Sequence, residues 1–284
     1  MTVKHRQTKR SLTAVLKTIV FYAVLIILTV IVSLPFFWMI STSLKNRGAL
    51  MSIPVEWLPK NPGLDAYQKL FTIPFFLKSI ANSFYLAIAC TLARLICAAM
   101  SAYGLTKIPF RGRGVILAVY ISALMIPAQI TFIPIFIIMS RAGLANNLNA
   151  FILLQLFNAF AIFMLCQHMR TIHDAYTEAA LLDGANRWQI FSRIILPFCS
   201  GTLATLAILG FMDIWNDYLL PLTLLTDRSK ATLTVLLSTL SSQYQSQYNL
   251  SMAGALVSIV PILAVYIGAQ KFFREGLAVG GVKG

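Results

Sequence analysis

Six stretches of mostly apolar residues, each near the length that crosses a lipid bilayer, constrain this chain more than any other feature. They lie at 18–40, 80–102, 115–139, 150–166, 194–214 and 252–269. A spanning helix needs roughly 20 predominantly apolar residues, so the fourth stretch needs its flanking residues to cross. The chain is 58% hydrophobic and 11% charged, whereas about a quarter of a soluble domain is charged. The sequence therefore predicts an all-α polytopic membrane protein with six transmembrane helices.

The basic residues orient these spans. A net charge of +14 would suggest nucleic acid in a soluble protein, but here most Lys and Arg lie between apolar stretches, where topology signals belong. If the N-terminus is inside, the inner segments are 1–17, 107–114, 168–193 and 271–284, and they carry most of the Lys and Arg. An even number of spans then places both termini in the cytoplasm. We expect a cytoplasmic N-terminal segment at 1–17, a transmembrane domain at 18–270 and a cytoplasmic tail at 271–284.

A polar, charged loop at about 168–193 separates the fourth and fifth spans. Asp174 is a plausible helix N-cap, and Glu178 falls in the first turns, where negative charge suits the helix dipole. Gly184 fits a helix end that needs a left-handed residue, and Asn186 can cap a second helix. The loop is predicted as helix–turn–helix facing the cytoplasm. Local physics alone is equally compatible with an ordinary amphipathic loop.

The same loop carries a recognisable motif. Glu178, Ala179 and Ala180, with Gly184 six residues after the glutamate and Pro197 closing an I-x-L-P, resemble the EAA loop of ABC-transporter permeases. Longer segments are similar to the maltose-type, carbohydrate-specific branch of these importer permeases. They are SAYGLTKIPFRGR at 101–113, MIPAQITFIPIFIIMSRAGLANN at 125–147, WNDYLLPL at 215–222, MAGALVSIVP at 252–261 and FFREGLAVGGVKG at 272–284.

The resemblance implies a type I ABC importer fold and a transporter of several chains in the bacterial inner membrane. The implied partners are a second homologous permease, two ATP-binding cassette ATPase subunits, an extracytoplasmic solute-binding protein and a carbohydrate substrate, with no nucleic acid. ATP and Mg are expected on the ATPases, since the sequence has no G-x-x-x-x-G-K-[ST] phosphate loop. This chain is therefore expected to carry no cofactor or metal and to be no enzyme.

The resemblance also assigns candidate contacts with the ATPases. In the coupling loop they are Glu178, Ala179, Ala180, Asp183, Gly184 and Ala185. In the tail they are Gly281, Val282 and Lys283. Two positions depart from the family pattern: His173 stands where proline is common, and Arg94 lies inside a span that is usually apolar.

Further polar and aromatic residues are candidates for a substrate path. Arg94 lines the path, pairs with a neighbouring helix, or marks a misplaced span boundary, because an unpaired charge at that depth is costly. Trp215, Asn216, Asp217 and Tyr218 lie near the outer end of the fifth span and suit sugar contact or an interfacial belt. The next outer loop carries Tyr244 and Tyr248, which either contact the binding protein or face solvent.

Two other classes of function find less support in the sequence. An ion-coupled secondary transporter of small solutes usually needs intramembrane carboxylates, and only Asp213 and Asp217 come close to that requirement. A membrane enzyme is poorly supported, because the sequence has neither H-E-x-x-H nor G-x-S-x-G. The sequence therefore favours a permease subunit whose energy comes from other chains.

Overall fold

The computed structural model describes residues 12–46, 48, 56–244 and 247–281, without the side chains of 12–15 and 271–281. Every regular element in these ranges is helical, which confirms the predicted all-α class. The chain divides into two compact units, one of residues 1–70 with 244–256 and one of residues 71–243 with 257–284. Each unit is described separately below.

The first unit contains helix α1 (Leu12–Ser43), most of α2 (Asp65–Thr72) and the first turns of α14 (Tyr248–Gly281). Helix α1 is apolar over a spanning length, and none of its most apolar window is buried. Its C-terminal end is fixed by polar contacts with later segments. The Ser43 hydroxyl lies 2.9 Å from the Tyr67 hydroxyl, and the Asn249 side chain donates to the Lys45 carbonyl at 3.0 Å.

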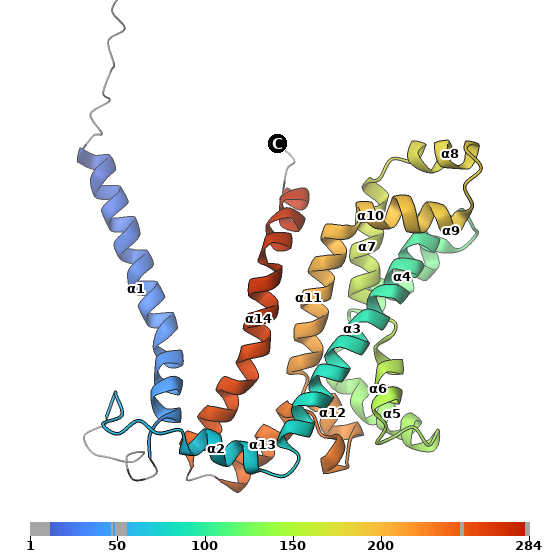
Figure 1. The fold of residues 1–284 in the computed structure, drawn as a ribbon. Helices are drawn as coiled ribbons and strands as arrows, with labels where there is room; N and C mark the ends of the chain where they lie inside the picture. The colour runs from blue at the N-terminus through green and yellow to red at the C-terminus, as the bar shows by residue number, and fades with distance from the viewer. Residues whose placement is uncertain (1–11, 47, 49–55, 245–246, 282–284) are drawn as a thin grey trace, which may run out of the picture. The chain divides into compact units, whose positions relative to one another are not determined.

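The second unit is organised around one long helix, α3 (Phe76–Lys107), which packs mainly against α11 and α7 (Figure 1). Small residues let these helices approach closely. At Gly210 of α11, an added Cβ would lie 3.4 Å from the Thr91 side chain of α3. The other elements are α4 (Arg113–Ala123), α5 (Ala128–Arg141), α6 (Leu148–Gln155), α7 (Ala159–Thr171), α8 (Ala175–Leu182), α9 (Arg187–Ile190), a π-helical turn (Phe191–Ile195), α10 (Leu196–Phe198), α11 (Ser200–Asn216), α12 (Leu219–Leu224), a 3-10 turn (Arg228–Lys230) and α13 (Leu233–Gln243).

Three of the six predicted spans are broken rather than continuous. The described helices include three long spanning helices and three bent pairs, which make up to six spans if each pair crosses once. The bend between α4 and α5 is 103°, between α6 and α7 it is 42°, and between the α9–α10 segment and α11 it is 76°.

Each of two breaks has a local cause. The α4–α5 break ends at Pro127, because the residue before a proline is disfavoured in helical conformation. The α6–α7 break ends at Asn158, whose side chain accepts from the Ala161 amide at 2.9 Å and starts α7. In contrast, Pro134 and Pro261 lie inside helices α5 and α14. The predicted span over 115–139 is therefore divided at Pro127 into two helices, α4 and α5.

Candidate coupling segment and membrane-embedded polar cavity

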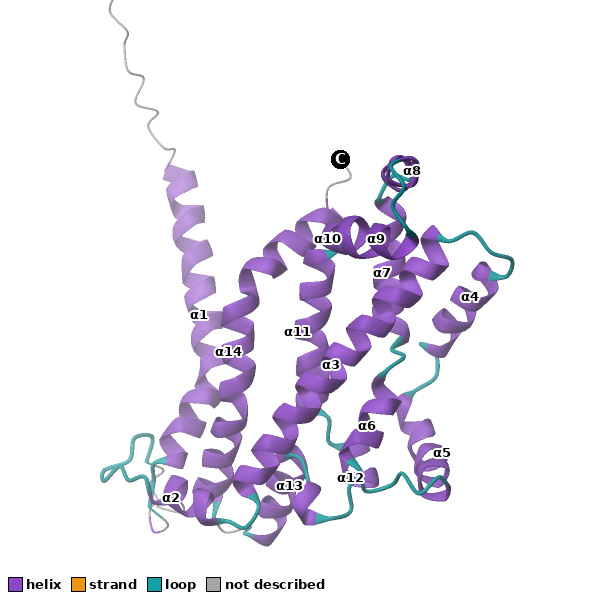
Figure 2. Ribbon diagram, turned by 45° about the vertical axis from the view of Figure 1, so that its right-hand side comes forward, coloured by secondary structure: helices purple, strands orange, loops and turns teal. Residues whose placement is uncertain are grey.

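Helix α8 forms a short, exposed element next to the ends of α3, α7 and α10 (Figures 1 and 2). Glu178 lies in its first turn, as expected. The prediction that Asp174 caps this helix is wrong. Asp174 has helical backbone angles and makes no capping hydrogen bond, and its carboxylate instead pairs with Lys107 at 2.7 Å.

Gly184 ends α8 in the conformation that the sequence predicts. Its φ is +81°, which L-residues with a side chain rarely adopt. The Gly184 amide donates to the Leu181 carbonyl at 3.1 Å, and the Ala185 amide donates to the Ala180 carbonyl at 2.9 Å. These two bonds form a Schellman motif, which satisfies carbonyls at the helix end. Gly184 therefore fixes where α8 stops and in which direction the chain leaves it.

A capping box starts the second helix of the loop at Asn186, which confirms its predicted role. The Asn186 side chain accepts from the Gln189 amide at 2.8 Å, and the Gln189 side chain accepts from the Asn186 amide at 2.8 Å. Beyond α9 the chain continues as the π-helical turn and α10. π-helical turns are rare in proteins, and those that occur often lie at functional sites.

Two residues of α3 fasten both ends of the loop. The ammonium group of Lys107 donates to the Ile172 carbonyl at 2.6 Å and to the Asp174 carboxylate at 2.7 Å. The Tyr103 hydroxyl donates to the Arg187 carbonyl at 3.2 Å. The hydrogen bond from Lys107, followed by its positive charge, lowers the pKa of Asp174. These contacts connect the loop that carries α8 to the end of α3.

His168 makes a third connection, from α7 to the bend before α11. Its Nε2 lies 3.1 Å from the Phe198 carbonyl oxygen, and its Nδ1 lies 3.0 Å from the Thr202 hydroxyl. A carbonyl oxygen only accepts, so Nε2 donates in this bond. The rings of Tyr176 on α8 and Phe198 on α10 are also in contact, with centroids 5.2 Å apart.

The predicted coupling residues divide into an outward and an inward set. Glu178, Ala179, Asp183 and Gly184 are exposed. Ala180 is buried and Ala185 packs against the core of the second unit. In the tail, Gly281 is the last residue of α14, whereas Val282 and Lys283 lie outside the described residues.

Sequence analysis missed several residues of this region. Leu182 is 90% exposed at the end of α8. Tyr103 and Lys107 are four apart, a spacing that places both on one face of a helix. The four-residue spacing is the feature of the sequence from which a shared role of Tyr103 and Lys107 could be predicted. No local pattern in the sequence indicates the contacts of His168.

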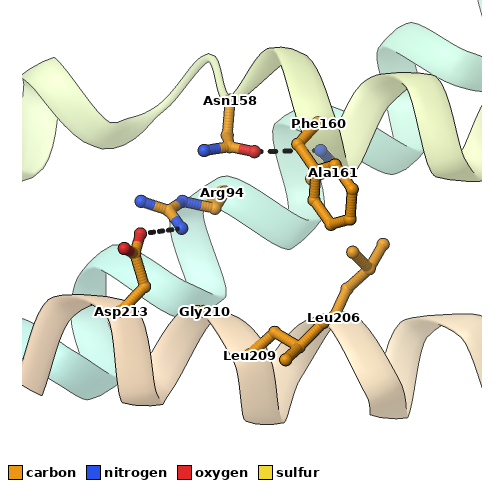
Figure 3. A pocket seen from close by; sticks show the side chains of 8 residues that line it. All are labelled: Arg94, Asn158, Phe160, Ala161, Leu206, Leu209, Gly210 and Asp213. Carbon is orange, nitrogen blue, oxygen red and sulfur yellow. Dashed lines mark hydrogen bonds and ion pairs between the residues drawn. The ribbon is translucent and has the colours of Figure 1, made fainter. Parts of the chain in front are cut away.

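A polar cavity lies at span depth between α3, α7 and α11 (Figure 3). The Arg94 guanidinium donates to the Asp213 carboxylate at 2.9 Å and to the Gln155 side chain at 2.6 Å. Arg94 is 5% exposed, whereas the Asp213 side chain is 64% exposed. The cavity has a volume of about 460 Å³, and its lining is Arg94, Asn158, Phe160, Ala161, Leu206, Leu209, Gly210 and Asp213. Of the alternatives for Arg94, pairing with a neighbouring helix is therefore confirmed, and the residue also lines a cavity.

Asp213 also borders a second cavity of about 640 Å³ at the end of α11, which three predicted path residues line: Asn216, Asp217 and Tyr218. Trp215 does not line it. Trp215 is 2% exposed, donates its indole N–H to the Ser258 carbonyl at 3.1 Å and stacks on Phe211. The tryptophan is a packing residue of the second unit, because its face of α11 is turned away from the cavities.

In the first unit, the Lys69 ammonium group lies 4.8 Å from the centre of the Tyr244 ring and donates to the Gln247 side chain at 2.8 Å. Tyr248 is 48% exposed at the start of α14. Within the described ranges, no group of three His, Cys, Asp or Glu residues is placed to bind a metal.

These features define a class: a polytopic helical membrane protein with an exposed helical loop fastened to its spans and polar cavities at span depth. Comparison with known proteins gives the family. Residues 94–278 match the family model of the binding-protein-dependent transport system inner membrane component. The chain belongs to this family, and its relatives are transport permeases rather than enzymes.

Curated relatives are similar over nearly the whole chain. The diacetylchitobiose uptake system permease protein NgcG of Streptomyces coelicolor is 33% identical, over 91% of this chain and 87% of that protein. The inner membrane ABC transporter permease protein YcjP of Escherichia coli is 32% identical, over 95% and 98%. The lactose transport system permease protein LacG of Rhizobium radiobacter is 30% identical, over 94% and 97%.

A solved structure agrees in fold. A chain of a bacterial ABC transporter involved in the import of the acidic polysaccharide alginate matches with a TM-score of 0.82 and 27% identity, over 93% of this chain and 98% of that chain. The predicted importer permease fold is therefore confirmed.

Proposed function

We propose that this chain is one of two permease subunits of an ATP-driven carbohydrate importer, and that α8 is the helix through which an ATPase subunit drives it. The named substrates of its relatives support the carbohydrate class, since they include diacetylchitobiose and lactose. The other subunits are a homologous permease, two ATPases that bind ATP and Mg, and an extracytoplasmic solute-binding protein. Both termini and α8 lie on the cytoplasmic side.

The observation that carries this proposal is the way α8 is presented and fastened. Its outer surface offers Leu182 and other exposed residues to a partner in water, while its N-terminal end is held by Lys107 and by the contact of Tyr176 with Phe198. A partner that pushes α8 therefore moves the end of α3 and the bend before α11. Those two helices carry the paired residues of the polar cavity, so the push reaches the centre of the membrane domain.

Carbohydrate passes along the cavities that Asp213 borders. Arg94, Asn216, Asp217 and Tyr218 supply hydrogen-bonding groups and one exposed aromatic ring, which suit hydroxyl groups and sugar faces. Trp215 is buried and lines neither of these cavities. Tyr244 and Tyr248 face the binding protein, and the tail residues Gly281, Val282 and Lys283 contact the ATPases.

Ion-coupled secondary transport is not favoured. The relatives belong to binding-protein-dependent systems, and the Asp213 carboxylate is engaged by Arg94 rather than left as an unpaired proton carrier. No second class of function has a specific observation in its favour.

Reconstitution tests the proposal. The complex of this chain with its permease partner, ATPases and binding protein is placed in proteoliposomes, and ATP hydrolysis and uptake are followed with a panel of neutral oligosaccharides. We expect uptake only when all subunits and ATP are present, because this chain has no phosphate-binding loop. Uptake by the chain alone, driven by an ion gradient without ATP, would contradict the proposal.

A further inference from the structure

An apolar cleft of about 240 Å³ separates α3 from the segment that begins with α9. Its lining is Met100, Tyr103 and Gly104 of α3 and Ile108 just after it, with Arg187, Trp188 and Phe191 of the facing segment. Gly104 borders open space in the cleft, since a Cβ at this position would meet no atom within 4 Å. Met100 and Gly104 lie one helical turn apart on the same face of α3, and Ile108, directly after the helix, completes the apolar Met100–Gly104–Ile108 stripe of the lining.

The geometry places this cleft at a membrane surface. The segment from Arg187 to Phe198 makes an angle of 76° with α11, and Figure 2 shows α9 and α10 lying across the end of that helix. If α11 spans the bilayer, this segment runs nearly along the bilayer surface. Trp188 is 63% exposed and Phe198 is 49% exposed. Exposed aromatic and basic residues on such a segment are typical of helices that lie in the interface.

The charge at the rim is positive and uncompensated. Arg187 is exposed, and its guanidinium has no hydrogen bond or ion pair to any residue that the structure describes. Asp174, the acidic residue that leads into α8, is already paired with Lys107. An apolar cleft with a free cation at its mouth, at interface level, fits a ligand with an apolar tail and an anionic head.

We propose that this cleft binds one anionic phospholipid, with an acyl chain against the Met100–Gly104–Ile108 stripe and the phosphate group at Arg187. Basic side chains near a membrane surface favour anionic lipids by charge. The lipid fills the space between α3 and the segment from Arg187 to Phe198, where Tyr103 donates to the Arg187 carbonyl. The binding itself depends on the membrane location of the chain and is independent of the proposed coupling role.

Native mass spectrometry of the assembled transporter tests this inference. The complex is taken from nanodiscs of equimolar phosphatidylglycerol and phosphatidylcholine, and the lipids that stay bound are counted and identified. We expect one tightly retained phosphatidylglycerol per copy of this chain. Arg187→Gln should lower its preference over phosphatidylcholine about fivefold, because one basic residue near the surface contributes on this scale. Gly104→Leu should abolish retention of either lipid, since its side chain fills the cleft.

Matched variants separate this site from general lipid contact. Arg111→Gln removes an exposed cation outside the cleft lining, and Gly114→Leu adds the same side chain where a Cβ also meets open space. Both should retain the lipid as the native chain does. Unchanged retention in both Arg187→Gln and Gly104→Leu, or equal loss in the matched variants, would overturn the inference. Because no ATP hydrolysis is measured, these results do not depend on whether α8 couples to an ATPase.

Discussion

Asp213→Ala is expected to destabilise the assembled subunit by about 3–5 kcal/mol, the usual cost of leaving a buried charge without its partner. Arg94 is 5% exposed and its Nε already lacks a partner among the described residues. Removal of Asp213 leaves the guanidinium with Gln155 alone. The effect appears as a lower midpoint of thermal unfolding of the purified complex.

Removal of the other member of the ion pair, Arg94, supplies the control. Arg94→Leu should cost clearly less, because the Asp213 side chain is 64% exposed and stays hydrated without its partner. The double variant Arg94→Leu with Asp213→Leu should recover much of the loss, since no charge remains at the site. If both single variants are destabilised equally and the double variant recovers nothing, the ion pair with Asp213 does not stabilise Arg94 in its buried position.

Gly184→Ala is expected to remove most of the stimulation of ATP hydrolysis by the binding protein while the complex still assembles. A side chain in the left-handed conformation costs about 1–2 kcal/mol, and the Schellman motif at φ +81° cannot form without this strain. The end of α8 shifts to relieve it, so the exposed surface of α8 no longer meets its partner. A reduction of about tenfold corresponds to a cost of this size.

Gly143→Ala is the matched control for this prediction. Gly143 has a φ of +68° and open space around its Cβ position, as Gly184 has, but it follows α5 rather than α8. Gly143→Ala carries similar strain and should leave stimulation near the native level. If both variants lose stimulation equally, the effect comes from general instability and not from α8. If Gly184→Ala is stimulated normally, α8 is not the element that transmits the signal.

The parts of the structure that the sequence predicts are those governed by local chemistry. Gly184 and Asn186 act within a few residues of their own positions, and apolar length alone identifies the spans. The parts that it does not predict depend on distant partners. Arg94 meets Asp213 119 positions later, and Lys107 meets Asp174 67 positions later. No single-segment pattern encodes such pairings, since they arise only when the helices pack.

The same limit explains the residues that were assigned differently. Asp174 has the right residue type for an N-cap, but a lysine from another helix competes for its carboxylate. Trp215 lies next to Asn216 in sequence, yet successive residues on a helix point about 100° apart, so one is buried while the other lines a cavity. The bend between α10 and α11 lies at Cys199, two residues after Pro197. In the sequence this place is visible only as the change from polar to apolar residues at which the fifth span begins.

The central claim is that the exposed end of α8 contacts an ATPase subunit, and cross-linking tests it most directly. In a chain whose four native cysteines are replaced, Leu182→Cys places a thiol at a position that is 90% exposed. Leu219→Cys places one beyond the other end of α11, where the native side chain is 42% exposed. We predict that a short bifunctional maleimide joins Leu182→Cys, and not Leu219→Cys, to an ATPase subunit that carries an engineered cysteine in its membrane-facing cleft. An assembled, ATP-hydrolysing complex in which Leu182→Cys gives no ATPase cross-link from any cysteine in that cleft would contradict the account.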